Sequence, residues 1–315
     1  GTINEKVALN GVDLTLEDGD FVTVIGGNGA GKSTTLNAVA GVWPVDSGKI
    51  FIGGDDVTKL SEYKRAKYLG RVFQDPMTGT ATTMSIEENM AIAARRGKSR
   101  GLRWGITKAE REKYRQMLST LHLGLEDRLT SKVGLLSGGQ RQRIGLARAM
   151  VMEPELVVAD EPISALDVSI RAQVLNLLKK FQREKDLTYL FIAHDLSIVR
   201  FISDRIAVIY KGDIVEIADA EELFNFPLHP YTHSLISAIP IPDPQLEKNK
   251  VLFTYDPSIH DYSTDKPELV CIGHDHWVFG NKKEIEEYKA TREKNVPLKT
   301  ITILDKDAPR PEEHH

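Results

Sequence analysis

The residues with the clearest chemical meaning form a glycine-rich segment from Gly26 to Ser33, with the pattern Gly-x4-Gly-Lys-Ser. Glycines let the backbone curl so that successive N–H groups face a phosphate, and a helix beginning there adds the positive end of its dipole. Lys32 supplies a full positive charge, and the hydroxyl of Ser33 is a ligand for Mg²⁺. This Walker A pattern is rare by chance, so it predicts a loop that binds the phosphates of a nucleotide.

A pair of carboxylates follows a second apolar run. Residues 156–159 read Leu-Val-Val-Ala, and Asp160 and Glu161 follow them directly. Open α/β sheets place their ligands at the carboxyl ends of strands. Asp160 there suits the coordination sphere of Mg²⁺, and Glu161 is placed to polarise a water molecule for in-line attack on a γ-phosphate. The pair therefore indicates hydrolysis of a bound nucleoside triphosphate.

These residues need a scaffold of strands that alternate with helices. Short apolar runs predict strands at residues 20–25, 156–159, 189–193, 205–210 and 214–217, with a hairpin signal at 211–213. Helices are predicted from residue 34 and over 169–185, and two capping boxes, Ser85 with Glu88 and Thr107 with Glu110, begin others. The alternation predicts an α/β core with a mostly parallel sheet.

Composition narrows the functional classes. The chain has 315 residues, enough for about two domains, and its net charge of −4 gives no reason to expect a nucleic-acid partner. No apolar run approaches the ~20 residues that cross a bilayer, so a membrane role is expected only through partners. The single cysteine, Cys271, excludes an internal disulfide and an all-cysteine iron–sulfur site within one chain. A reducing cytosol is the expected compartment.

A third motif, Leu136-Ser-Gly-Gly-Gln140, lies between the first two. With it the chain resembles the ATP-binding subunits of ABC transporters. The resemblance implies a P-loop NTPase of ABC type, with a mostly parallel sheet, an antiparallel β subdomain, an inserted helical subdomain and a small C-terminal extension. The expected division is a first core part at 1–83, the helical subdomain at 84–136, a second core part at 137–242, and the extension with a tag at 243–315.

The resemblance also implies roles for individual residues. Two chains would sandwich two ATP molecules with Mg²⁺, and Glu161, His194 and Gln74 would be catalytic. Mg²⁺ would be held by Ser33, Gln74 and Asp160. Ser164 and Asp167 would belong to the D-loop that crosses the dimer interface. The ATP-binding loop would comprise Gly26, Gly27, Asn28, Gly29, Ala30, Gly31, Lys32, Ser33 and Thr34. The signature motif, which would face the nucleotide of the partner chain, would comprise Ser137, Gly138, Gly139 and Gln140.

The two halves of the chain resemble different branches of the family. Residues 140–295, with His229-Pro-Tyr-Thr232 and the proline-rich segment 238–244, resemble the oligopeptide and dipeptide importers. The first half, including residues 42–45, 77–82 and 98–104, resembles another bacterial group. We therefore hypothesise a chimera joined between Gln140 and Arg143. Many importer relatives carry a cysteine-rich iron–sulfur insert, which is not expected with Cys271 alone.

The two ends of the chain depart from the family pattern. No aromatic residue precedes Val7 to stack on adenine, which predicts weak discrimination between ATP and GTP. Residues 297–304 form a strand-like run that would replace a missing edge strand. The start at Gly1 and the final histidines resemble an engineered chain with a partial histidine tag.

The function that these observations favour is ATP hydrolysis in an importer of peptides. The expected partners are a second ATP-binding subunit, identical or not, transmembrane permease subunits and indirectly a substrate-binding protein, at the cytoplasmic face of the plasma membrane. Two alternatives stay open: a non-transport ABC ATPase of DNA repair or translation, and an engineered module that binds nucleotide without activity. The interval from Gln74 to Ser137 suits a small helical subdomain rather than the long coiled coil of repair proteins.

Overall fold

The computed structural model describes residues 8–75, 77–96, 105–120, 124–164, 166–240, 250, 252–294 and 296–297. The chain divides into two compact units, Gly1–Asp213 and Ile214–His315. No helix in the described ranges is long and apolar enough to cross a membrane. The predicted four-part division of the chain stays a prediction, and its last boundary falls at residues 241–249, outside the described ranges.

The first unit is built on a parallel sheet whose strand order is β4-β5-β6-β1-β7. Its strands read as continuous apolar runs because helices cover both faces of such a sheet, and every residue of β1 is buried. The predicted mostly parallel sheet is confirmed. The strands are β1 (Phe21–Ile25), β4 (Leu69–Val72), β5 (Leu156–Asp160), β6 (Thr188–Ile192) and β7 (Arg205–Tyr210); β2 (Phe51–Ile52) and β3 (Asp55–Asp56) form a separate antiparallel pair.

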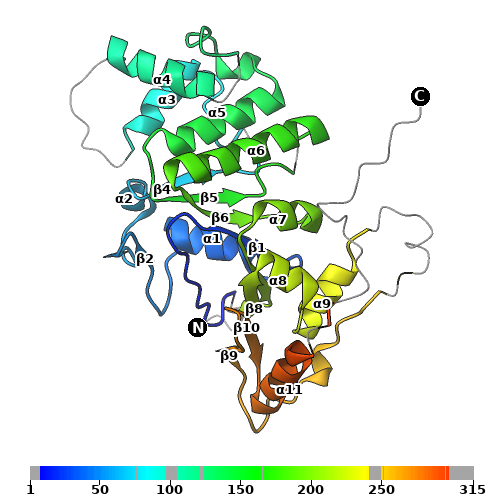
Figure 1. Cartoon of the computed structure of the whole chain (residues 1–315). Helices are drawn as coiled ribbons and strands as arrows, with labels where there is room; N and C mark the ends of the chain where they lie inside the picture. Colours follow the sequence, from blue (N-terminus) through cyan, green and yellow to red (C-terminus); the bar gives the residue numbers. More distant parts are fainter. Residues whose placement is uncertain are drawn as a thin grey trace, which may run out of the picture. The chain divides into compact units, whose positions relative to one another are not determined.

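The helices of this unit lie on both sides of the sheet. Figure 1 shows α5 and α6 on one side of the strands and α1 on the other. They are α1 (Lys32–Ala40), α2 (Glu62–Arg65), α3 (Ile86–Ala94), α4 (Lys108–Thr120), α5 (Gly138–Met150), α6 (Val168–Lys185) and α7 (Leu196–Ile202), with a 3-10 turn η1 (Val133–Leu135). The predicted strands and the long helix agree with these bounds within one or two residues.

Two helix starts follow the side chains that the sequence provides. Ser85 accepts a hydrogen bond from the N–H of Glu88, whose carboxylate accepts one from the N–H of Ser85, so the predicted capping box of α3 is present. Thr107 and Glu110 make the same reciprocal bonds at the start of α4. Each box satisfies backbone donors that the helix itself leaves free. Local sequence therefore fixes these helix starts.

A buried arginine holds the far end of the helix that follows the glycine loop. Arg65 is 1% exposed. Its guanidinium donates to the carbonyl oxygens of Ala38 and Val39, at the C-terminal end of α1, and to those of Thr58 and Leu60. Carbonyls at a helix C-terminus have no partner within the helix and carry partial negative charge. Arg65 therefore anchors α1 to the chain that follows it.

We expect Arg65→Leu to lower the free energy of unfolding by about 3 kcal/mol or more, because it leaves several buried carbonyls without donors. Chemical denaturation followed by circular dichroism measures the change. The neighbouring Lys64 is exposed, so Lys64→Leu is the matched control and should change the free energy of unfolding by less than about 0.5 kcal/mol. Equal stability of the two variants would show that Arg65 does not anchor α1.

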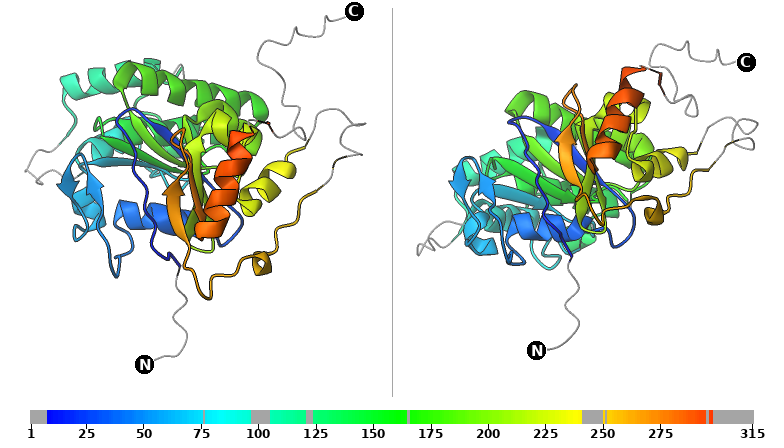
Figure 2. Two further views of the ribbon diagram at one scale, coloured as in Figure 1. Left: turned by 60° about the horizontal axis from the view of Figure 1, so that its bottom comes forward. Right: turned by 90° about the horizontal axis from the view of Figure 1, so that it is seen from below.

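The second unit contains an antiparallel sheet in the order β8-β10-β9. Figure 2 shows the C-terminal helix α11, in red, beside the orange strands β9 and β10. Leu228, Val278, Ile285 and Tyr288 form its apolar cluster. The elements are β8 (Asp213–Asp219), α8 (Ala220–Asn225), α9 (Pro230–Ser237), η2 (Pro257–Ile259), β9 (Glu268–Cys271), β10 (Trp277–Gly280) and α11 (Lys282–Glu293).

A buried ion pair organises this second unit. Glu216 and His276 are both 0% exposed, and His276 Nε2 lies 2.6 Å from Glu216 Oε1. The carboxylate of Glu216 also accepts from the N–H groups of Leu228 and His229. Burial opposes the charge on His276, but the hydrogen bonds that its ring donates to the carboxylates of Glu216 and Glu222 outweigh this effect and raise the pKa of the imidazole. The segment beginning at His229 is thereby fixed to β8.

Several predictions fall outside the described ranges. Residues 1–7, where the sequence lacks an aromatic residue for adenine, are among them. So are residues 97–104, in the first-half resemblance, and 298–304 of the strand-like run. Weak discrimination between ATP and GTP and the replacement edge strand therefore stay predictions.

Candidate nucleotide-binding and hydrolysis site

The glycine loop joins β1 to α1, as the sequence predicts. Gly31 is the N-cap of α1 with φ 110°, and Gly29 has φ 73°, backbone conformations that side-chain-bearing residues rarely adopt. A Cβ atom on Gly26 would lie 2.3 Å from the carbonyl oxygen of Ile209. Close packing therefore requires glycine at position 26, and the backbone conformation favours glycine at positions 29 and 31. Ser33 follows as the second residue of α1 and is exposed.

Lys32 is the charged centre of this loop. It is buried, and its Nζ donates to the carbonyl oxygens of Gly26, at 2.7 Å, and Gly27, at 2.9 Å. Burial lowers the pKa of Lys32, and the charges of Glu161 and Asp160 partly offset that effect. Both carboxylates at the end of β5 therefore lie close enough to act on the lysine of the glycine loop.

The order of the strands brings the predicted catalytic residues together. Gln74, Glu161 and His194 follow the carboxyl ends of β4, β5 and β6, which are parallel neighbours in the sheet. Strand β1, which leads into the glycine loop, pairs with β6 on the other side. Because parallel neighbours end at one edge, the side chains after them converge there.

Glu161 is the meeting point of these side chains. One carboxylate oxygen, Oε1, lies 2.5 Å from His194 Nε2. The other, Oε2, accepts a longer hydrogen bond of 3.5 Å from Gln74 Nε2. The backbone of Glu161 has φ 43°, a strained conformation for a residue with a side chain, and its N–H donates to the carbonyl oxygen of Ile192 at the end of β6. The fold thus holds this carboxylate in place at the expense of local strain.

The start of the predicted D-loop folds back on Glu161. Ser164 Oγ donates to the carbonyl oxygen of Glu161 at 3.0 Å, and Gln74 Nε2 donates to the same hydroxyl at 3.4 Å. Asp167 is the N-cap residue of α6, where its carbonyl accepts from the N–H of Arg171. The structure therefore brings Ser164 to the site and places Asp167 at the start of the next helix.

The predicted signature residues form the N-terminus of α5. Ser137 and Gln140 make a reciprocal capping box around Gly138 and Gly139. A Cβ atom on Gly139 would lie 2.9 Å from Cδ1 of Ile170, whereas one on Gly138 would meet nothing within 4 Å. Together with residues of the D-loop region, Ser137, Gly138 and Gly139 line a surface hollow. The open side of Gly138 can receive another molecule.

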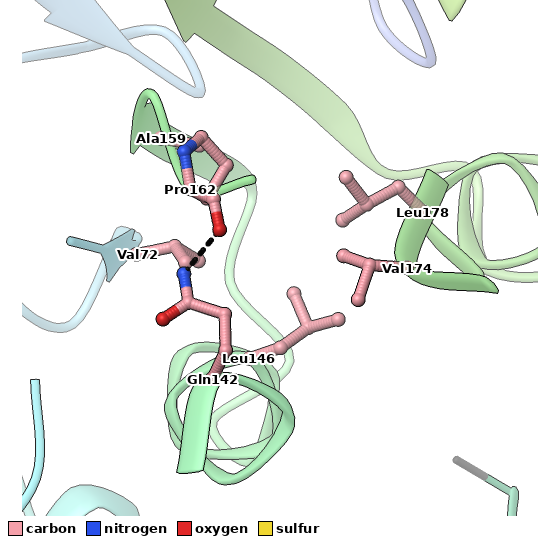
Figure 3. A pocket seen from close by; sticks show the side chains of 7 residues that line it. All are labelled: Val72, Gln142, Leu146, Ala159, Pro162, Val174 and Leu178. Carbon is pink, nitrogen blue, oxygen red and sulfur yellow. Dashed lines mark hydrogen bonds between the residues drawn. The ribbon is translucent and has the colours of Figure 1, made fainter. Parts of the chain in front are cut away.

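One buried residue near the site was missed by the sequence analysis. Gln142 of α5 is 2% exposed, and its Nε2 donates to the carbonyl oxygens of Phe73, at 3.0 Å, and Pro162, at 2.6 Å. Figure 3 shows the second of these bonds. Gln142 lies four residues before Leu146, on the same buried face of α5. A polar residue at a position where the helix pattern calls for an apolar one needs buried hydrogen-bond partners, and this departure from the pattern could have marked Gln142 in the sequence.

Comparisons with known proteins agree with this geometry. The family model described as ABC transporter matches residues 9–164, and the one described as oligopeptide/dipeptide transporter, C-terminal region, matches residues 215–267. The chain is 48% identical over 287 residues to the oligopeptide transport ATP-binding protein AmiF of Streptococcus pneumoniae, covering 90% of this chain and 92% of the relative. It is 44% identical over 265 residues to OppF of Bacillus subtilis, covering 80% and 83%.

Solved structures with the same fold are also similar in sequence. A dimeric ATP-binding cassette, MJ0796, bound to ADP and phosphate in a post-hydrolysis state, is 30% identical with a TM-score of 0.58, covering 68% of this chain and 90% of the other. The ADP form of MJ1267, a cassette of an ABC transporter, is 27% identical with a TM-score of 0.62, covering 73% and 92%.

The comparisons do not support the hypothesis of a chimera. AmiF matches this chain in one alignment over 90% of its length, and that alignment spans both sides of the proposed junction near Gln140. The separate resemblance of the first half to another bacterial group therefore has no support, and the oligopeptide/dipeptide type extends across the chain. We conclude that the chain belongs to the ABC transporter family, as an ATP-binding subunit of the oligopeptide/dipeptide transporter type.

Proposed function

We propose that this chain hydrolyses ATP to drive the import of oligopeptides or dipeptides through transmembrane permease subunits. The observation that carries the proposal is the convergence of Gln74 and His194 on Glu161. The negative charge of Glu161 also acts on Lys32 of the phosphate-binding loop, where it raises the pKa of the lysine against the effect of burial. Relatives that match 90% of the chain are named oligopeptide transport ATP-binding proteins, which supports a peptide substrate.

In the proposed reaction the glycine loop holds the phosphates of ATP. The N–H groups of the loop and of the first turn of α1 point toward them, and Lys32 exchanges its bonds to Gly26 and Gly27 for bonds to the β- and γ-phosphates. Hydroxyl, amide and carboxylate oxygens on Ser33, Gln74 and Asp160 are the donors that Mg²⁺ prefers, and these residues would hold it. When bound, Mg²⁺ neutralises charge that develops on the phosphates.

The carboxylate of Glu161 then acts as the general base. It accepts a proton from a water molecule while that water's oxygen forms a bond to the γ-phosphorus, and the bond to the oxygen bridging the β- and γ-phosphates breaks. The products are ADP and inorganic phosphate. His194, which lies against Glu161, hydrogen-bonds the γ-phosphate, and Gln74 orients the water from the opposite side. Glu161 therefore removes the proton, while Gln74 and His194 hold the water and the γ-phosphate in position.

We also infer that a second ATP-binding subunit completes the site. The open side of Gly138, next to the positive end of α5, suits a γ-phosphate bound by another chain. A dimeric cassette bound to ADP and phosphate has the same fold, which supports such an assembly. The further partners would be permease subunits and, through them, a substrate-binding protein, with the chain at the cytoplasmic face of the membrane.

Functional replacement tests the transport role. This chain, produced in a Bacillus subtilis strain that lacks its own OppF, should restore uptake of labelled oligopeptides, and the Lys32→Ala variant should not. Both proteins must be present at equal levels in the membrane fraction, together with the permease subunits. Uptake that stays at the deletion-strain level, although the chain co-purifies with the permease and hydrolyses ATP, would contradict a peptide substrate.

Alanine substitutions in α5 test the composite site. We expect Gly138→Ala to change the free energy of unfolding by less than about 0.5 kcal/mol, because its side chain would meet nothing in this chain. The same variant should lower the rate of phosphate release by about tenfold or more, because the added methyl group displaces the partner's phosphate. Gly145→Ala, on the same helix and equally open, is the control and should keep the full rate. Equal rates for both variants would rule out a phosphate contact at Gly138.

A further inference from the structure

We propose that Gln142 is a positioning residue for ATP hydrolysis, and that its side-chain amide sets how far Gln74 lies from Glu161. This inference rests on the proposed roles of those two residues. In the described part of the chain, the side chain of Gln142 hydrogen-bonds to neither of those side chains. It acts on the main chain at their immediate neighbours, Phe73 and Pro162.

A single nitrogen atom makes both connections. The amide Nε2 of Gln142 carries two hydrogens and donates to two carbonyl oxygens, that of Phe73 at 3.0 Å and that of Pro162 at 2.6 Å. Phe73 directly precedes Gln74, and Pro162 directly follows Glu161. The amide therefore bridges the loop after β4 and the loop after β5, one residue away from each catalytic side chain.

The surroundings make this bridge rigid. Gln142 is 2% exposed, and Figure 3 shows it among apolar side chains that include Leu146 and Val174. A carbonyl buried among such groups has no water to replace a lost donor, so both bonds are strongly favoured over the open arrangement. The side chain also starts from a helix, which restricts its movement more than a loop would. One side chain thereby holds the two loops together beyond Val72 and Ala159, the last paired residues of β4 and β5.

The same helix carries the residues that we propose face a second subunit. Ser137 caps α5, and Gln142 lies five residues further along, in the second turn. Arg148, about three turns beyond Ser137, donates to the carbonyl oxygen of Gly79, which lies further along the segment after Gln74. A shift of α5 when Ser137 meets a nucleotide therefore moves both loops together. We infer that Gln142 affects the rate of the chemical step and not the affinity for ATP.

The test compares two buried glutamines. Gln182 of α6 is 9% exposed, and its Nε2 donates to the carbonyl oxygen of Gly19, at the edge of the sheet where β1 begins, opposite the site. Gln142→Leu and Gln182→Leu each remove a buried amide, so both should lower the melting temperature. Only Gln142→Leu should lower kcat, by about tenfold or more, with KM and Kd for ATP within about twofold of the wild type. An equal loss of kcat in both variants, or an unchanged kcat in Gln142→Leu, overturns the proposal.

Two further measurements separate positioning from a general loss of structure. Gln142→Glu keeps the shape of the side chain but donates one hydrogen bond only when protonated, so its kcat relative to the wild type at the same pH should recover as the pH falls. In a Glu161→Gln background, adding Gln142→Leu should lower the remaining single-turnover rate by less than about twofold, because the base through which Gln142 acts is already absent. A full, multiplicative loss there, or a pH-independent defect in Gln142→Glu, overturns the proposal.

Failure of this inference is distinguishable from failure of the proposed function. If Glu161→Gln alone retains the wild-type rate, the assignment of the general base is wrong. If Glu161→Gln abolishes turnover while Gln142→Leu retains it, the base is correct and only the role of Gln142 is wrong.

Discussion

Replacing Glu161 by glutamine should lower the rate of phosphate release by about 10²- to 10⁴-fold, the range typical of a lost general base. Glutamine has nearly the same shape, and as a neutral amide it can neither accept the proton of the attacking water nor repel the γ-phosphate. The dissociation constant for ATP should therefore stay within about twofold of the wild-type value, or fall. Single-turnover phosphate release and equilibrium nucleotide binding, measured on the same preparations, give both quantities.

Glu153 provides the control for this substitution. Like Glu161 it is a glutamate with positive φ, 51°, but it precedes β5 and so lies at the opposite edge of the sheet. Glu153→Gln should retain the full rate. A Glu161→Gln protein that releases phosphate within about threefold of the wild type would contradict the assigned base. If both proteins released phosphate no faster than ATP hydrolyses without protein, the chain would be a nucleotide-binding module without hydrolysis.

Replacing Lys32 by alanine has its largest effect on binding. The ammonium group would make charge-assisted hydrogen bonds to the phosphates, each contributing roughly 1.5–3 kcal/mol. Lys32 also holds the carbonyls of Gly26 and Gly27, so its loss loosens the loop itself. A total near 3 kcal/mol corresponds to an affinity for ATP about 10²-fold weaker.

Isothermal titration calorimetry with ATP and Mg²⁺ measures this effect. The exposed Lys64 lies away from the loop in α2, and Lys64→Ala should bind ATP as tightly as the wild type. The comparison separates the loss of one particular lysine from the loss of one positive charge. Unchanged affinity in Lys32→Ala would mean that the phosphates bind elsewhere.

The features predictable from the sequence are those that depend on near neighbours in the chain. The strand, glycine loop and helix around Gly26–Ser33 follow each other directly, and the capping box at Ser85 is complete within four residues. Glu161 and His194 each follow an apolar run, so their places at the ends of strands were also predictable. In each case the pattern lies within one short segment.

The arrangement of those segments was not predictable in the same way. That β4, β5 and β6 are neighbours, and so bring Gln74, Glu161 and His194 to one edge, depends on packing between distant residues. Arg65 and Gln142 are polar residues whose partners include carbonyls at least 20 positions away in the sequence, and carbonyls are present at every position. No residue pattern therefore marks these partners in advance.

The hypothesis of a chimera failed for a related physical reason. It was based on short loop segments such as 42–45 and 77–82, which tolerate variation because they pack less tightly than strands. Similarity over the whole chain weighs the buried strands and the motifs together, and relatives match across the proposed junction. Divergent loops are therefore compatible with one continuous family member.

A structure of the Glu161→Gln protein with ATP and Mg²⁺ tests the central claim most directly. Our account predicts the γ-phosphate within hydrogen-bonding distance of Lys32 and His194, and residue 161 facing the water opposite the bridging oxygen. It also predicts Ser137 of a second chain on the same phosphate. A γ-phosphate out of reach of both His194 and residue 161 would contradict the account.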